Sequence, residues 1–118
     1  EQSTRAELRC PDPSCNPYLA FATMLACGLD GIQRGLVAPP PAEDNVFEFD
    51  ASALEEAHIE MLPGSLAEAL AELCEDRVVQ EALGEHVYRW FLRAKTAEWD
   101  AFRLYVSQWE LDRYLRRF

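Results

Sequence analysis

The chain is poor in basic residues. It has 11 lysine and arginine residues against 21 aspartate and glutamate residues, which gives a formal net charge of −10 at pH 7. This excess of negative charge opposes approach to nucleic-acid phosphates and to anionic membrane surfaces. We therefore expect neither nucleic acid nor a membrane as a partner.

Cysteine and histidine are also scarce, and their positions do not form a zinc-site pattern. The four cysteines are Cys10, Cys15, Cys27 and Cys74. They lack the paired spacing of zinc ligands, and neither His58 nor His86 lies near them in the sequence. Three of the four have apolar neighbours, so we interpret them as small buried residues with reduced thiols rather than as a disulfide framework. Neither histidine stands in a constellation with serine, cysteine or carboxylate groups that suggests a nucleophile or a base, and we interpret both as structural.

Long apolar runs are missing as well. No segment approaches the roughly 18 consecutive apolar residues of a membrane span, and no signal peptide is visible. The expected location is therefore the cytoplasm. A chain of 118 residues forms one domain at most, and a chain of that size buries about two thirds of its unfolded surface. We expect a modest core.

An alternating charged segment stands near the start of the sequence. Arg5, Glu7 and Arg9 occupy every second position, and apolar residues stand between them. In a β-strand this spacing places two cations and one carboxylate on the same face. The pattern alone favours a solvated edge strand whose charges block edge-to-edge pairing. Because a proline-rich corner and an apolar helix follow directly, a rigidly supported ligand site is the alternative.

The corner is followed by a helix that is apolar nearly all round. Asn16 is a good N-cap and Pro17 fits the first helical position, so a helix is predicted from residue 17 to about 32. A helix of this kind packs on more than one side, and we expect parts of the protein outside this sequence to cover it. Residues 42–63 are predicted to form an extended excursion with one helical turn over 51–58.

The second half of the chain is predicted to be helical. Ser65 and Glu68 form a capping-box pattern before a helix over 66–74, and Gly84 is predicted to end another helix that begins at residue 76. The remaining helices are predicted at 85 to about 106, with a wide apolar stripe, and at 108 to about 116, where terminal arginines suit the helix dipole. Ser107 is a candidate cap for the last one. The fold class is therefore mainly α, with one N-terminal strand and about five helices.

Two features that could suggest a ligand site have simpler interpretations. Trp90, Trp99 and Trp109 stand at helical spacing in an acidic chain, so we interpret them as residues that pack in a core or between subunits rather than as a stacking platform. The segment 28–31, Gly-Leu-Asp-Gly, lacks the length and the lysine of a phosphate loop. We interpret it as a helix end.

The string Arg5-Ala-Glu-Leu-Arg9, followed by a PDPS-x-NPYLAF corner, resembles the C-terminal signature of type I bacterial glutamine synthetases. The resemblance continues in Leu29-Asp-Gly-Ile32, Asp44-Asn45-Val-Phe47, Leu62-Pro-Gly-Ser-Leu-Ala-Glu-Ala-Leu70, Ala82-Leu-Gly-Glu-His86, Lys95-Thr-Ala-Glu-Trp-Asp100 and Trp109-Glu110 with Tyr114. It covers essentially all 118 residues. The family is α+β, and its members are several times longer than this chain. By this resemblance, residues 1–118 are expected to be the C-terminal segment of the catalytic domain, without the N-terminal grasp-like domain and most of the catalytic sheet.

The resemblance also implies a reaction. Enzymes of this family ligate ammonia to L-glutamate through γ-glutamyl phosphate, with ATP as substrate and Mg²⁺ or Mn²⁺ as cofactor. By similarity, Glu7 is expected to bind the metal on the nucleotide side, Arg9 to bind the substrate glutamate, and Arg5 to lie near the ATP phosphates. No residue of this chain is expected to be catalytic alone, so we expect the isolated chain to be inactive.

The resemblance further implies an assembly and a subclass. The family works as a homo-oligomer, a dodecamer of two stacked rings. Phe47 stands where the adenylylated subgroup has tyrosine, so the chain resembles the non-adenylylated, Gram-positive-like subclass. The alternative is a non-catalytic helical module that acts in assembly or interaction. Relatives that glutamylate other amines usually depart from the PDPS corner, which is intact here.

Overall fold

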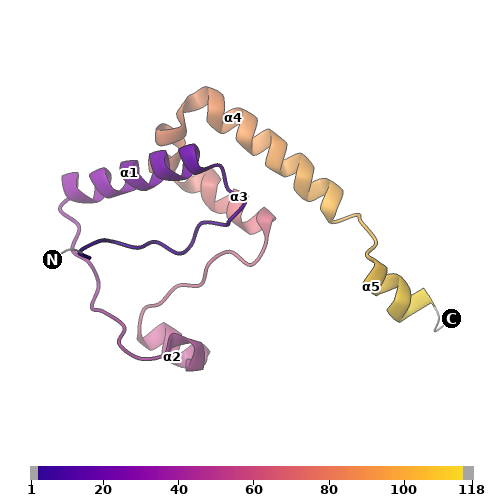
Figure 1. Ribbon diagram of the computed structural model, residues 1–118, viewed down its shortest axis with the longest axis horizontal. Coiled ribbons are helices and arrows are strands. Elements are labelled where there is room, and N and C mark those ends of the chain that lie inside the picture. The colour runs from indigo at the N-terminus through magenta and orange to yellow at the C-terminus, as the bar shows by residue number, and fades with distance from the viewer. Residues whose placement is uncertain (1–2, 116–118) are drawn as a thin grey trace.

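The structure is a computed structural model, and it describes residues 3–115 (Figure 1). Its elements are α1 (Pro17–Gln33), the 3-10 helix η1 (Val46–Glu48), α2 (Ala51–Glu56), α3 (Leu66–Glu75), α4 (Arg77–Phe102), α5 (Gln108–Glu110) and the π-helical turn η2 (Leu111–Leu115). The prediction of a mainly α chain is confirmed. The predicted N-terminal strand is wrong, because residues 4–10 have no regular structure. A strand needs a paired neighbour for its backbone groups, and no other strand lies within residues 3–115.

Helix α1 begins as its sequence predicts. The Asn16 side chain accepts hydrogen bonds from the backbone N–H groups of Tyr18, at 3.0 Å, and Leu19, at 3.4 Å. Pro17 occupies the first turn, where its missing N–H costs nothing. The helix ends at Gln33, one residue later than predicted. The segment 28–31 therefore lies inside the helix, not at its end.

A single residue joins α3 to α4. Asp76 ends α3, and its side chain also caps α4 by accepting a hydrogen bond from the Val79 backbone N–H at 3.0 Å. The Gln80 amide donates to the backbone carbonyls of Leu73 and Cys74, at 2.9 and 2.8 Å. These bonds satisfy acceptors that the end of α3 would otherwise leave unpaired. The two helices are thus connected without a loop.

Two predicted features of helix ends are confirmed in part. Ser65 does cap α3 by accepting from the Glu68 N–H at 3.2 Å, but the Glu68 carboxylate accepts from Gly64 N–H, at 2.8 Å, and not from Ser65. Gly84 interrupts α4 with a φ of 71°, which glycine adopts without steric cost. The two helices predicted on either side of Gly84 therefore form one helix with a kink at that glycine.

The C-terminal part follows the predicted pattern with shorter elements. Helix α4 ends at Phe102 rather than near residue 106. Ser107 begins α5 with a complete capping box, in which its N–H donates to the Glu110 carboxylate at 2.7 Å. The described turns end at Leu115. The arginines predicted to lie at the end of this helix, at positions 116 and 117, are outside the described residues.

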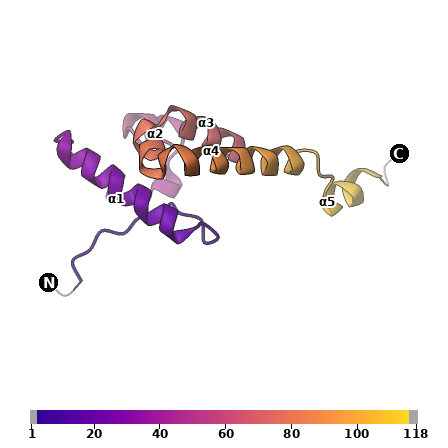
Figure 2. The same cartoon turned by 90° about the horizontal axis from the view of Figure 1, so that it is seen from above.

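Helices α1 and α3 both pack against α4 and form the only sizeable contacts between separate helices in the described part (Figure 1). The second half of α4 and α5 project away from them (Figure 2). The radius of gyration is 18.8 Å, whereas a compact chain of this length has about 13–14 Å. The accessible surface is 10991 Å², against roughly 6500 Å² for a compact protein of this mass. The expected burial of two thirds of the surface is therefore not reached.

The core is correspondingly small. Leu70 on α3, at 9% exposure, is the one residue classed as buried within residues 3–115. All four cysteines are free and exposed in the described part. The prediction of reduced thiols is compatible with this, but the prediction that three of them are buried is wrong. They stand on surfaces that the rest of residues 3–115 leaves exposed.

The Asn16 cap can be tested directly. Asn16→Ala removes the acceptor for the first N–H groups of α1, and such losses cost about 1 kcal/mol. We expect a lower helical signal in far-UV circular dichroism and an earlier transition in urea. Asn16→Asp keeps an acceptor oxygen and should behave like the parent chain. Equal helicity for Asn16→Ala and the parent would contradict this assignment.

Candidate functional site

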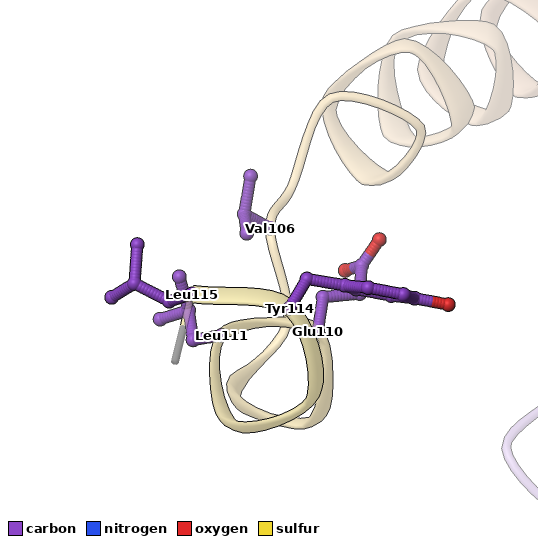
Figure 3. A pocket seen from close by; sticks show the side chains of 5 residues that line it. All are labelled: Val106, Glu110, Leu111, Tyr114 and Leu115. Atoms are coloured by element: carbon purple, nitrogen blue, oxygen red, sulfur yellow. The ribbon is translucent and has the colours of Figure 1, made fainter. Parts of the chain in front are cut away.

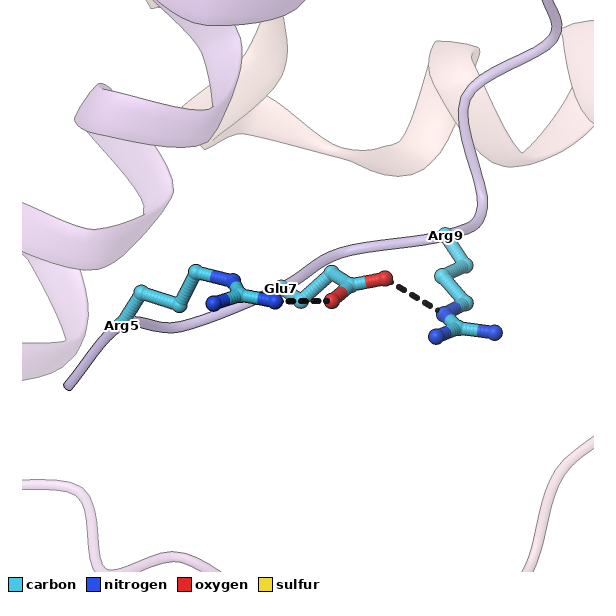
Figure 4. Close-up of polar contacts among 3 residues, drawn as sticks. All are labelled: Arg5, Glu7 and Arg9. Atoms are coloured by element: carbon cyan, nitrogen blue, oxygen red, sulfur yellow. Dashed lines mark hydrogen bonds and ion pairs between the residues drawn. The ribbon is translucent and has the colours of Figure 1, made fainter. Parts of the chain in front are cut away.

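The three charged residues of the N-terminal segment lie together although no strand forms. Arg9 Nε donates a hydrogen bond to Glu7 Oε1 at 2.7 Å, and Arg5 Nη2 lies 3.7 Å from Glu7 Oε2 (Figure 4). Glu7 thus stands between two guanidinium groups, as the alternating sequence predicted. The side chains are 68%, 49% and 85% exposed for Arg5, Glu7 and Arg9. The cluster is open to solvent and accessible to a ligand.

The apolar part of the same segment faces the helices. Leu8 lines a hollow together with Phe21 and Met24 of α1 and Val79 of α4. Glu7 also lines this hollow. The segment therefore runs beside α1 and the start of α4, with Glu7 next to their apolar side chains.

A hydrogen-bonded turn connects the charged segment to α1. The Asp12 carboxylate accepts from the hydroxyl of Ser14 and from its backbone N–H, the latter at 2.7 Å, and Cys15 N–H donates to the Asp12 carbonyl at 3.0 Å. The Ser14 hydroxyl, and then its N–H, hold the pKa of Asp12 below its ordinary value of 3.8. Asn16 follows at once as the helix cap. The corner thus links the charged segment to α1 through local hydrogen bonds.

The charge arrangement suits recognition of anions. A guanidinium group binds carboxylates and phosphates with paired N–H donors, and Arg9 uses only its Nε–H toward Glu7. Exposed ion pairs of this kind contribute about 0–1 kcal/mol. A substrate carboxylate or phosphate could therefore replace Glu7 as a partner at little cost. Glu7 would then be available to a cation.

Glu7 alone would not form a complete metal site. Carboxylate oxygen is a hard donor that suits Mg²⁺. Among residues 3–115, however, no group of three or more histidine, cysteine, aspartate or glutamate side chains is placed to hold a metal ion. His58 and His86 do not approach Glu7 as co-ligands within that part of the chain. Any further ligands must come from outside the described residues.

Sequence reasoning missed a second cluster. His86, Arg89, Trp90 and Arg93 line one face of α4, and Arg93 Cζ lies 5.4 Å from the centre of the Trp90 ring. Their spacing of three and four residues was the available signal. Trp90 is 57% exposed, so it is not a core residue of the described chain, and packing against another subunit stays a prediction. Farther along, Val106, Glu110, Leu111, Tyr114 and Leu115 line a shallow apolar hollow (Figure 3).

Comparison with known proteins assigns the family. Residues 1–114 match the family described as glutamine synthetase, catalytic domain. The chain belongs to the glutamine synthetase family. It is 56% identical over 115 residues to the glutamine synthetase of Thermus thermophilus, 48% over 115 residues to that of Methanococcus voltae, and 42% over 116 residues to that of Staphylococcus aureus. These alignments cover 98% of this chain and 26% of each relative.

The chain therefore spans about a quarter of the length of the glutamine synthetases that it matches. The family assignment agrees with the resemblance inferred from the Arg5-to-Arg9 string and the proline-rich corner. None of the helices in residues 3–115 has the length and apolar character needed to cross a bilayer.

The Asp12 corner predicts a pH effect with a defined sign. Because the folded-state pKa is lowered, the stability that Asp12 contributes is present above its unfolded pKa and is lost as pH falls through the folded value. We expect its carboxyl carbon to titrate below 3.8 in an NMR pH series. Ser14→Ala should raise that midpoint, whereas Ser14→Thr should preserve it. An unchanged midpoint in Ser14→Ala would refute the hydrogen-bonded corner.

Proposed function

We propose that this chain is the C-terminal segment of a type I glutamine synthetase catalytic domain and supplies one wall of its active site. The observation that carries the proposal is the exposed Arg5, Glu7, Arg9 cluster, in a chain that matches the family over residues 1–114. The reaction is the ATP-dependent ligation of ammonia to L-glutamate through γ-glutamyl phosphate. The chain alone lacks the other walls of that site.

Each residue of the cluster has a distinct role in this proposal. Arg9 binds a carboxylate of the substrate glutamate through its paired N–H groups, and Arg5 lies beside the ATP phosphates. Both cations offset negative charge that builds up when a carboxylate and a phosphoryl group approach each other. The corner at Asp12 and Ser14 connects the segment to α1 through a local hydrogen bond.

Glu7 would hold a divalent cation, Mg²⁺ or Mn²⁺, with other ligands from elsewhere in the enzyme. Its hard oxygen donors fit such an ion, and its partial exposure leaves them accessible. Such a cation, when bound, neutralises phosphate charge. When Arg5 and Arg9 bind the substrate anions, the two Glu7 oxygens that they contact in this structure become available to the ion.

We also propose the subclass and the assembly. Phe47 lies in η1 and is 95% exposed, so a modifying enzyme would reach this position. Phenylalanine has no hydroxyl group to accept an adenylyl group. This supports a non-adenylylated enzyme of the Gram-positive-like subclass. The working form of the complete enzyme would be a dodecamer.

The proposal can be tested in a complete enzyme. The Thermus thermophilus glutamine synthetase would receive this chain in place of its matching 115-residue segment, and phosphate release would be measured with ATP, glutamate, ammonium and Mg²⁺. We expect an active chimera, and a loss of about 100-fold or more in kcat for Glu7→Gln. Arg9→Lys should mainly raise KM for glutamate, since lysine cannot bind a carboxylate with two prongs. The isolated chain should release no phosphate.

Glu98→Gln is the matched control, because Glu98 is also an exposed glutamate in an ion pair, with Lys95 at 2.7 Å. It should leave activity unchanged. Glutamate- and ammonium-dependent phosphate release by the isolated chain would contradict the one-wall proposal. A folded chimera without activity would instead favour the alternative, a non-catalytic helical assembly module.

A further inference from the structure

The solvent side of α4 carries four side chains that the proposed function does not use. They are His86, Arg89, Trp90 and Arg93, and each lies three or four residues from two of the others, so they share one face of the helix. All four are exposed, and Trp90 keeps 57% of its surface open to solvent. We call these four residues the α4 surface.

The α4 surface is not the side on which this helix packs. Val87, Tyr88, Phe91 and Leu92 alternate with it along the helix and are half-buried. The Tyr88 hydroxyl lies 3.7 Å from Cys74 Sγ of α3, so this other side faces the neighbouring helices. Arginine is almost never fully buried in a domain core unless it is paired. We therefore expect the α4 surface to lie on the outside of the protein.

Trp90 stands between two of the basic side chains. Arg93 Cζ lies 5.4 Å from the centre of the Trp90 ring, and the centre of the His86 ring lies 6.4 Å from it. Among residues 3–115, Arg93 forms no ion pair, so its N–H groups are open to a ligand. Arg89 lies 3.7 Å from the Glu85 carboxylate. Such an exposed pair is weak, and an incoming carboxylate can replace it.

The composition of this surface indicates a protein partner. Tryptophan and arginine are the side chains most enriched among the residues that carry the binding energy of protein interfaces. The four residues come from one helix, and no second element encloses them, whereas small ligands bind in concave sites that bury most of their surface. The net charge of −10 opposes nucleic acid.

The distribution of charge indicates which protein segment fits. Residues 85–118 carry seven basic and five acidic side chains, a balance of 7 − 5 = +2. Residues 1–84 carry the other four basic and 16 acidic side chains, a balance of 4 − 16 = −12. An acidic segment is therefore repelled by most of the chain and attracted to the region of the α4 surface. Complementary charge of this kind directs a partner to one orientation.

We propose that the α4 surface binds an acidic segment of a different protein. Arg89 and Arg93 bind its carboxylates, and Trp90 packs against an apolar side chain between them. A second copy of this chain is a poorer partner, because two chains of net charge −10 repel each other. The inference does not depend on the proposed function, since it uses none of the residues of the Arg5, Glu7, Arg9 cluster.

The test is a binding titration with the Thermus thermophilus chimera. The probe is a fluorescent peptide that repeats glutamate, leucine, glutamate and alanine, and its control has glutamine in place of glutamate. We expect saturable binding of the glutamate peptide alone by fluorescence anisotropy at low salt. Trp90→Ala should raise Kd by about tenfold or more, and Arg93→Gln by about fivefold. Phosphate release by both variants should equal that of the parent chimera.

Arg103→Gln is the matched control. Arg103 is also an exposed arginine at α4, but it donates to Asp100 at 2.8 Å and lies outside the α4 surface. Its replacement removes the same charge as Arg93→Gln and should leave Kd unchanged. The substituted side chains are exposed, so far-UV circular dichroism should be equal for all variants. The same titration with the 118-residue chain tests the surface without the rest of the enzyme.

Four results would overturn the proposal. The first is no binding of the glutamate peptide by the chimera and by the 118-residue chain. The second is equal Kd for the parent and Trp90→Ala, which would show unspecific charge attraction. The third is binding by the chain but not by the folded chimera, which would mean that a neighbouring subunit covers Trp90. The fourth is a dimer of the chain in sedimentation that Trp90→Ala dissociates, which would make a second copy the partner. An inactive chimera with Trp90-dependent binding would reject the proposed function alone.

Discussion

The packing of α1 and α3 against α4 is the contact on which the rest of this structure depends. It holds Leu70, the one side chain buried among residues 3–115, and it fixes the helix to which the charged N-terminal segment is attached. Outside this three-helix contact the chain is open, and its accessible surface far exceeds that of a compact protein of equal mass. The described residues thus form ordered helices but not a compact domain.

This open arrangement limits what the charged cluster can do. Arg5, Glu7 and Arg9 are brought together by short-range geometry, since residues two apart in an extended segment point the same way. A working site needs more than that, because metal ions and two anionic substrates require ligands from several directions. In the proposed function, the exposed cluster is one part of such a site, and the remaining ligands come from outside the described residues.

Local signals in the sequence predicted local structure well. The cap at Asn16, the capping pattern at Ser107 and the left-handed residue at Gly84 each depend on atoms within a few positions, and each lies where the pattern indicated. The charged cluster formed for the same reason.

Features that depend on distant partners could not be predicted from this segment. The strand expected near Arg5 has no neighbour to pair with in the described part, and the cysteines expected to be buried are exposed. The sequence pattern correctly identified apolar helix faces. The surfaces that would bury those faces are not among the described residues. The exposed cluster around Trp90 on α4 was not predicted, because the apolar ring of Trp90 suggested a packing position.

The shared cap at Asp76 has a consequence for how this segment can change in length. Because α3 and α4 meet without a loop, one added or deleted residue there would turn α4 by about 100° relative to α3. The face of α4 that receives α1 would then point elsewhere, and the charged segment would lose its support. The connection between α1 and α2 contains a long irregular stretch and can absorb such changes. Length variation in this part of the family should therefore be confined to the region before α2 and absent at the α3–α4 joint.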